Sequence, residues 1–100
     1  MKWADCVITA VKFKKERRHI EQVKLWKDEG EQLSSTEKII SRQDVISLME
    51  MKVSFVTAYQ KEGKWQKGDN VEIVLINNVQ FIKTDGDRIE EDNLGKLPEF

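Results

Sequence analysis

The sequence contains a single cysteine, a single histidine and a single proline among its 100 residues. Because Cys6 stands alone, an intramolecular disulfide and a zinc site built from several cysteines are both excluded. The lone histidine, His19, lies in no catalytic motif, so no Ser-His-Asp set can be assembled from the chain. A protein without disulfides is expected in a reducing cytoplasm.

Long hydrophobic runs are absent as well. The longest uninterrupted apolar run covers residues 73–76, whereas a membrane-spanning helix needs about 20 apolar residues. Residues 1–13 hold no sustained apolar stretch and do not read as a signal peptide. The chain has no phosphate-cradling glycine loop and no dinucleotide-binding fingerprint. We therefore expect neither a membrane partner nor a cofactor.

Charged residues make up 35% of the sequence, but the two signs nearly cancel and leave a net charge of −1. No strong overall field therefore attracts nucleic acid or membranes. The charges are unevenly placed, because residues 1–28 carry eight Lys/Arg against four Asp/Glu and residues 85–100 carry two against six. Either the two ends neutralise each other in the fold, or the protein has a basic end.

The N-terminal region predicts a β-hairpin. Residues 6–13 alternate and are rich in β-branched side chains, which favours a strand. A polar stretch, residues 14–18, follows. The apolar spacing of residues 19–26 fits either a helix or a strand, and we favour a strand because a short polar connector after a strand usually forms a hairpin.

A short helix is predicted over about residues 42–51, after a loop over residues 27–40. Ser41 precedes it and Asp44 follows three positions on, as in a capping box that satisfies orphan backbone N–H groups. One helical stripe of apolar side chains is expected in the core: Val45, Leu48 and Met49.

The remaining sequence predicts three strands. Residues 52–59 alternate, residues 60–70 form a long polar connection, and residues 71–76 and 79–84 flank Asn77-Asn78. Asparagine tolerates positive φ, which a two-residue type I′ turn requires at both positions. Such a turn sets the cross-strand pairs Ile76 with Val79, Val74 with Phe81, and Glu72 with Lys83.

These elements predict the order β-β-α-β-β-β. The fold class is therefore a small single α+β domain over residues 1–100, with one short helix packed on a curved antiparallel sheet or open barrel. No internal repeat, low-complexity segment or domain linker is present.

Several stretches together resemble a known family. They are "VITAVKF", "SRQDVISLMEMKVSFVTAY", "GKWQKGDNVEIV" and "IKTDGDRIEEDNLGKLPEF". They resemble the uncharacterised prokaryotic family called domain of unknown function 3892, most specifically in Thr84-Asp85-Gly86 and Asp92-Asn93-Leu94-Gly95. The resemblance covers nearly the whole chain and implies a compact stand-alone domain, without implying any activity, cofactor or catalytic residue. Family members often carry a glycine where this chain has Met51-Lys52.

Five carboxylates crowd residues 83–95 and raise the question of a cation site. Counted from Asp85, a calcium loop of the EF-hand type needs glycine at the sixth position, where this chain has Glu90. The template fails, so we expect no metal. We interpret Asp85-Gly86 as a turn, and Glu90, Glu91 and Asp92 as solvated side chains. If a cation did bind, its ligands would be Asp85, Asp87 and Asp92.

A catalytic Cys6–His19 pair is not expected. Cysteine catalysis needs the two side chains in hydrogen-bond contact. The predicted hairpin places them at opposite ends, about 20 Å apart for a strand of this length. We expect Cys6 to be a small buried apolar residue and His19 to lie on the surface beside the basic turn.

Two basic elements suggest a nucleic-acid partner as an alternative. A turn of clustered cations could follow phosphates, and a tryptophan among lysines could stack on bases. The candidate residues are Lys12, Lys14, Lys15, Arg17, Arg18, Lys64, Trp65 and Lys67. Charged turns also keep β proteins soluble, and a loop tryptophan often folds back onto a small core. Trp3 and Trp26 are expected in the core or on a sheet face.

The sequence does not state the function. The first hypothesis is a small cytoplasmic, non-enzymatic binding or interaction module with an unknown protein partner, acting as a monomer or homodimer. The alternative is a weak nucleic-acid-binding protein that uses the basic turn and Trp65. An enzyme with carboxylates around residues 85–92 is the third and weakest hypothesis.

Overall fold

The computed structural model describes residues 4–16, 19–28, 37–84, 89–95 and 97–100, and the structural statements below refer to these. Seven strands and one helix form the described part. They are β1 (Cys6–Phe13), β2 (Ile20–Lys27), β3 (Lys38–Ser41), α1 (Arg42–Glu50), β4 (Phe55–Lys61), β5 (Lys64–Asn70), β6 (Glu72–Ile76) and β7 (Val79–Lys83).

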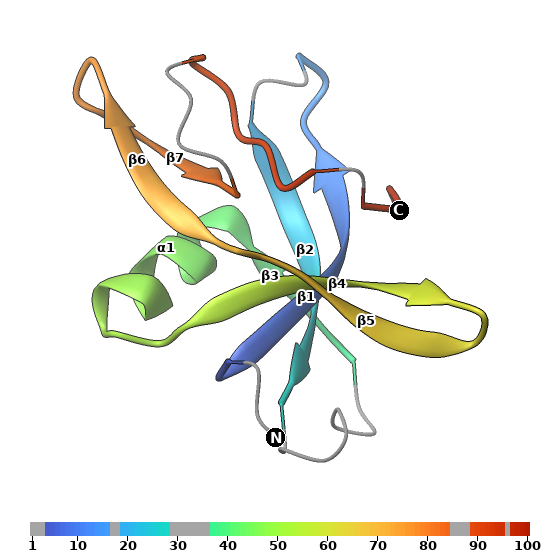
Figure 1. Cartoon of the computed structure of the whole chain (residues 1–100). Helices are drawn as coiled ribbons and strands as arrows, with labels where there is room; N and C mark the ends of the chain where they lie inside the picture. Colours follow the sequence, from blue (N-terminus) through green and yellow to red (C-terminus); the bar gives the residue numbers. More distant parts are fainter. Residues whose placement is uncertain (1–3, 17–18, 29–36, 85–88, 96) are drawn as a thin grey trace.

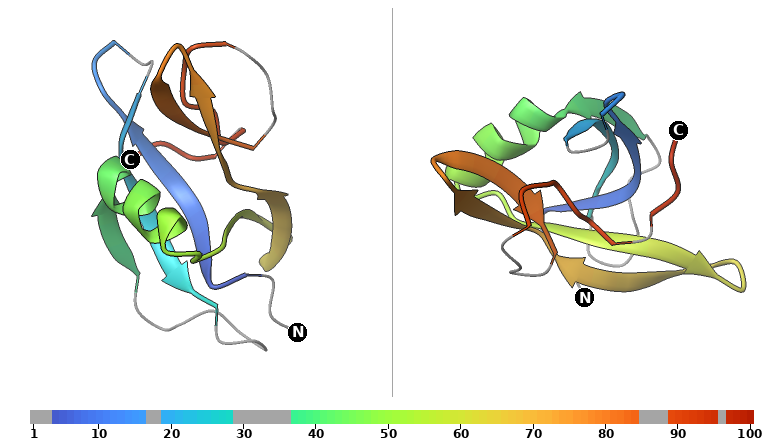
Figure 2. Two further views of the ribbon diagram at one scale, coloured as in Figure 1. Left: turned by 90° about the vertical axis from the view of Figure 1, so that its left-hand side faces the viewer. Right: turned by 90° about the horizontal axis from the view of Figure 1, so that it is seen from above.

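The strands form two sheets. The main sheet has the order β3-β2-β1-β4-β5, and β6 and β7 form a separate two-stranded sheet. Helix α1 and the β6–β7 hairpin lie on the same side of the main sheet, on the left in Figure 1 and again in the view from above in Figure 2. The prediction of a small α+β domain with an open sheet is confirmed. The sheet is mixed rather than wholly antiparallel, because β1 and β4 run parallel.

The predicted N-terminal hairpin is confirmed. Strands β1 and β2 pair antiparallel from Cys6 with Lys27 to Phe13 with Ile20. Five consecutive residues of β1, from Val7 to Val11, are buried. A strand buried on both faces reads as a nearly continuous apolar run, which is the composition that this stretch shows.

Two strands lie where the sequence predicted loops. The loop prediction over residues 27–40 is wrong at β3, which pairs with β2, and residues 29–36 lie outside the described residues. The prediction of a polar connection over residues 60–70 is wrong at β5, which pairs with β4 through a two-residue turn at Glu62 and Gly63, both at positive φ. Positive φ at both turn positions matches the right-handed twist of a hairpin. Strand β5 is mostly polar and β3 has only four residues, so neither shows a clear apolar periodicity. Both edge strands are stabilised by backbone pairing with a neighbouring strand.

The predicted helix is confirmed as α1. Ser41 is its N-cap, and the Ser41 hydroxyl accepts a hydrogen bond from the Asp44 N–H at 3.1 Å. The stripe expected in the core packs there, with Ile46 as a further buried residue that the prediction missed. No described helix is long and apolar enough to cross a membrane. After the helix, Lys52 adopts φ of 71°, a conformation that favours glycine.

The β6–β7 hairpin has the predicted register. Its strands pair Glu72 with Lys83, Val74 with Phe81 and Ile76 with Val79. Asn77 and Asn78 both have positive φ, 50° and 67°, as a type I′ turn requires. Here the turn residues and the alternation of the strands were sufficient to fix the pairing.

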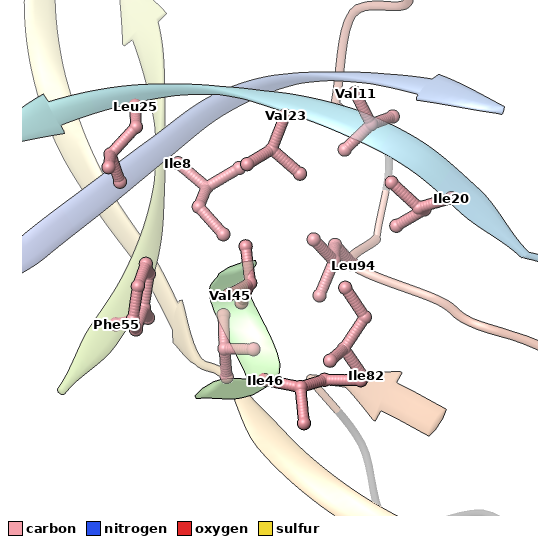
Figure 3. Close-up of a cluster of buried hydrophobic side chains, with 11 residues drawn as sticks. Ile8, Val11, Ile20, Val23, Leu25, Val45, Ile46, Phe55, Ile82 and Leu94 are labelled. Carbon is pink, nitrogen blue, oxygen red and sulfur yellow. The ribbon is translucent and has the colours of Figure 1, made fainter. Parts of the chain in front are cut away.

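A single large core lies between the main sheet, α1 and the β6–β7 hairpin, as Figure 3 shows. Its fully or nearly fully buried members are Ile8, Val11, Ile20, Val23, Leu25, Val45, Ile46, Phe55, Val71, Ile82 and Leu94. The C-terminal segment completes it, because Leu94 packs into the cluster and Leu97 packs against it. The last residues then run beside β1, where the Val11 N–H donates to the Pro98 carbonyl and the Phe100 N–H donates to the Val11 carbonyl.

Replacing Gly68 by alanine is expected to destabilise the β4–β5 pair. A Cβ built at Gly68 would collide with the Thr57 hydroxyl and come within 3.1 Å of the Thr57 carbonyl oxygen. That hydroxyl already accepts a hydrogen bond from the Asp69 N–H at 3.0 Å and is buried. Overpacking of this kind costs about 1–3 kcal/mol of unfolding free energy, measurable by urea denaturation.

The double variant Gly68→Ala/Thr57→Ala provides the control, because it removes the atom that the new methyl group would strike. We expect its loss to be smaller than the sum of the two single losses. Strict additivity would show that the close approach of Gly68 to Thr57 does not constrain the hairpin.

Candidate functional site

One face of the main sheet gathers aromatic and cationic side chains. It is the face opposite to α1 and the β6–β7 hairpin, and none of the described elements packs across it as a layer. We call it the aromatic face. The side chains that define it are Thr9, Lys12, Lys24, Trp26, Trp65, Lys67 and Phe100.

Two tryptophans form the centre of the aromatic face. Trp26 on β2 and Trp65 on β5 have ring centroids 6.3 Å apart, with the planes tilted by 56°. The Trp26 indole Nε1–H donates to the Thr9 hydroxyl at 3.0 Å, which fixes the orientation of the ring. Both rings are partly buried, and such tilted aromatic pairs contribute roughly 0.5–1.5 kcal/mol beyond their buried area.

Trp65 reaches this position because β5 folds back along β4. It pairs with Gln60 and packs over a small cluster of buried residues, Val7, Val56 and Ala58. The prediction that Trp65 lies in a connecting loop is wrong, and the expectation that Trp26 lies in the core or on a sheet face is confirmed. Trp3, for which the same was expected, lies outside the described residues. The tryptophan is held in place by the sheet, so it offers a pre-oriented surface.

Lysines outnumber carboxylates on this face. The register-paired residues of the five strands on this side include three lysines, Lys12, Lys24 and Lys67, and no Asp or Glu. The Lys24 ammonium lies 5.0 Å from the centroid of the Phe100 ring. Acidic partners reach two of the lysines from the rim, Glu21 at 3.9 Å from Lys12 and Glu37 at 3.7 Å from Lys24. Exposed pairs of this kind contribute only about 0–1 kcal/mol.

The structure divides the residues that the sequence suggested for nucleic-acid binding. Lys12, Trp65 and Lys67 belong to the aromatic face, whereas Lys64 pairs with Lys61 and lies on the other side of the hairpin. Lys14 and Lys15 are exposed in the turn after β1. Arg17 and Arg18 lie outside the described residues. The basic turn and the β4–β5 tip extend in different directions (Figure 1).

Sequence reasoning missed Thr9, Lys24 and Phe100 as parts of this surface. The alternation of β2 gives a signal for Lys24, because residues two apart on a strand share a face with each other, here Lys24 and Trp26. No comparable signal exists for Phe100, which reaches the face only because the C-terminal segment pairs with β1.

A second polar cluster lies at the opposite side of the molecule, around Asp92. The prediction that Asp92 is solvated is wrong, because its side chain is fully buried. One carboxylate oxygen accepts from the Ile20 N–H at 2.8 Å and from Arg42 Nε at 2.7 Å. The other accepts from the Ile82 N–H at 2.9 Å and from an Arg42 terminal nitrogen at 3.3 Å. A guanidinium that meets both oxygens of one carboxylate is a strong, geometrically specific pair.

His19 joins this cluster with 31% of its side chain exposed, so the expectation of a surface histidine is met only in part. Its ring stacks on Phe81, with centroids 5.4 Å apart and planes within 6°. Its Nδ1 is buried 3.7 Å from an Asp92 oxygen and makes no hydrogen bond within the described residues. Chain segments from β2, α1, β7 and the C-terminal segment thus meet at one carboxylate.

This cluster fits a structural role. Asp92 already accepts four hydrogen bonds, so its oxygens are committed to holding the fold together rather than to moving protons or binding a cation. A turn follows it, in which the Gly95 N–H donates to the Asn93 side-chain oxygen at 2.9 Å.

The described residues form neither of the two other candidate sites, a metal site and a catalytic Cys6–His19 pair. Asp85 and Asp87 lie outside them, and within them no group of three His, Cys, Asp or Glu side chains is placed to hold a metal ion. Cys6 pairs with Lys27 at one end of the β1–β2 hairpin, and His19 stands at the other end, as predicted. Cys6 is half-buried against the core.

Comparison with known proteins gives one match. A family model described as "Protein of unknown function (DUF3892)" matches residues 7–98. No curated protein and no solved structure matches this chain.

Proposed function

Because the chain belongs to the DUF3892 family, whose function is unknown, we propose a function from its surface: this protein is a small non-enzymatic binding module that contacts its partner through the aromatic face. The pairing of Trp26 with Trp65 on a sheet face left open by the described elements carries this proposal. Tryptophan is enriched among the residues that dominate binding energy at protein interfaces.

The surroundings of the tryptophans support the same role. Ile39 on β3 is paired with Lys24 on β2 and is 52% exposed, and Phe100 is 36% exposed. Exposed apolar side chains that adjoin partly buried aromatic rings and are rimmed by polar groups are typical of a contact surface. Because the backbone of the sheet fixes these side chains, little conformational entropy is lost on binding.

The non-enzymatic part of the proposal rests on the chemistry of the described polar groups. The buried carboxylate of Asp92 is saturated with hydrogen bonds, and Cys6 and His19 are separated by the length of the β1–β2 hairpin. General acid–base and nucleophilic catalysis both need groups in mutual hydrogen-bond reach.

A matched pair of double variants tests the proposal. Ile39→Asp/Gln60→Asp adds two carboxylates to the aromatic face, since Gln60 is paired with Trp65. Met51→Asp/Gln66→Asp changes an apolar residue and a glutamine that are also exposed but lie elsewhere. Each chain is immobilised, and the species that it retains saturably from a lysate are compared, with and without nuclease.

We expect the aromatic-face variant to lose retention by about tenfold or more, because two carboxylates without partners would lie within the contact surface, while the control variant keeps it. Sedimentation of the free proteins shows whether the partner is a second copy of the chain. The proposal is contradicted if both variants retain the same species equally, or if the unmodified protein retains nothing saturably.

A further inference from the structure

We infer that the partner of the aromatic face is a single-stranded nucleic acid, with bases stacked on the tryptophans and phosphates held by the lysines. This inference rests on the proposed function of that face and names its ligand class. From the sequence, the nucleic-acid contact was predicted at the basic turn and a loop tryptophan. We now infer that the contact lies on the aromatic face of the main sheet, because Trp65 belongs to strand β5.

Charge complementarity is the first argument. Lys12, Lys24 and Lys67 stand on three different strands of the aromatic face, without a register-paired carboxylate on that side. Glu21 forms an exposed pair with Lys12, and Glu37 forms a half-buried pair with Lys24. A phosphate can replace the exposed Glu21 carboxylate at little cost. A polyanion that crosses the strands would meet cations from β1, β2 and β5.

The tryptophan pair is the second argument, and it favours bases over an acidic peptide. Single-strand binders combine a cationic surface with aromatic rings on which successive bases stack. Trp26 and Trp65 provide two rings whose centroids lie 6.3 Å apart. The hydrogen bond from Trp26 to Thr9 fixes the orientation of the Trp26 ring. Bases in a duplex are already stacked on one another, so this surface selects unpaired strands.

The β4–β5 hairpin supplies a matched test. Lys67 pairs with Ala58 on the aromatic face, and Lys64, three residues earlier on the same strand, lies on the opposite side. Lys67→Glu and Lys64→Glu change the net charge by the same amount. Both lysines are exposed, so neither variant is expected to unfold the domain.

The probe is an oligothymidine of about 12 nucleotides, within the range of known single-strand site sizes. Tryptophan fluorescence is titrated at about 50 and about 200 mM salt. The indole Nε1–H signals of Trp26 and Trp65 are followed by NMR in parallel. A duplex of equal length and a polyglutamate of equal charge serve as competitors without free bases.

We expect saturable quenching, shifts of both indole signals, and affinity that weakens with salt. Lys67→Glu is expected to weaken binding several-fold and to reduce the slope of log affinity against log salt by about 0.7 or more, because a phosphate contact is lost. Lys64→Glu is expected to change affinity by less than about twofold, since a cation away from the contact contributes only long-range attraction.

Three results would overturn the inference. No quenching at the lower salt would remove nucleic acid as the ligand. If polyglutamate bound as tightly as the oligothymidine, the aromatic face would recognise negative charge without a contribution from the bases. The partner of the proposed module would then be an acidic protein. Equal losses from the two lysine variants would indicate non-specific attraction to the hairpin. The lysate comparison tests the module independently of all three.

Discussion

Replacing Asp92 by alanine is expected to lower the free energy of unfolding by about 3–5 kcal/mol, because the change leaves a mostly buried charged partner without its counter-ion. Arg42 would lose both of its contacts to the carboxylate, at 2.7 Å and 3.3 Å. The backbone N–H groups of Ile20 and Ile82 would lose their acceptor in the protein interior. A domain of this size is stable by only about 5–15 kcal/mol, so the variant would lie close to the unfolding threshold.

Urea denaturation and thermal unfolding measure the loss, with each kcal/mol moving Tm by about 4–8 °C for a domain of this length. Glu91→Ala is the matched control, since it removes a neighbouring carboxylate that is not buried, and it should change stability by less than about 0.5 kcal/mol. The double variant Asp92→Ala/Arg42→Met should cost less than the two single changes added together. If Asp92→Ala were as mild as Glu91→Ala, Asp92 would not be the point that holds the C-terminal segment.

The second large effect is expected from Phe55→Ala, which should cost about 3–5 kcal/mol through lost burial and the cavity that remains. Phe55 begins β4 and is 2% exposed. Figure 3 shows its ring directed into the cluster that also holds Leu25 and Val45. Three parts of the fold, the β1–β2 hairpin, α1 and β4, meet at this cluster, so the surroundings have little freedom to collapse into the space.

Two further variants calibrate this prediction by denaturant unfolding. Tyr59→Ala removes an aromatic ring from the same strand at a position that is 47% exposed, and a loss of about 1 kcal/mol or less is expected there. Phe55→Leu keeps most of the volume and should cost less than about 1.5 kcal/mol. Equal losses from Phe55→Ala and Tyr59→Ala would place the centre of the core elsewhere.

Elements with a complete local signal were predictable. The cap at Ser41 and the apolar stripe after it predicted α1, and Asn77-Asn78 between alternating strands predicted both the β6–β7 hairpin and its register. In each case the deciding interactions join residues a few positions apart, such as the Ser41 hydroxyl and the Asp44 N–H. Contacts between residues close in the sequence can be predicted from a short stretch of consecutive residues.

The candidate site was only partly predictable. The sequence predicted Trp65, Lys12 and Lys67 as nucleic-acid-binding residues. It also predicted Lys64, which the register of β5 places on the other side of the hairpin. It had no means to bring Trp26 to Trp65, because β2 and β5 are separated in the sheet by β1 and β4. The position of each strand within the sheet decides which side chains share a face.

The sequence by itself determined the fold class, helix α1, and the β1–β2 and β6–β7 hairpins. The tertiary structure decided that β3 and β5 are strands, that β1 and β4 run parallel, and that Asp92 is buried. The physical reason is that these features depend on contacts between residues far apart in the chain. The bond from the Ile20 N–H to Asp92 spans 72 positions. From the sequence, Asp92 is predicted to be solvated because its neighbours are acidic. Its burial is favourable only because the fold brings an arginine and two backbone N–H groups to its carboxylate.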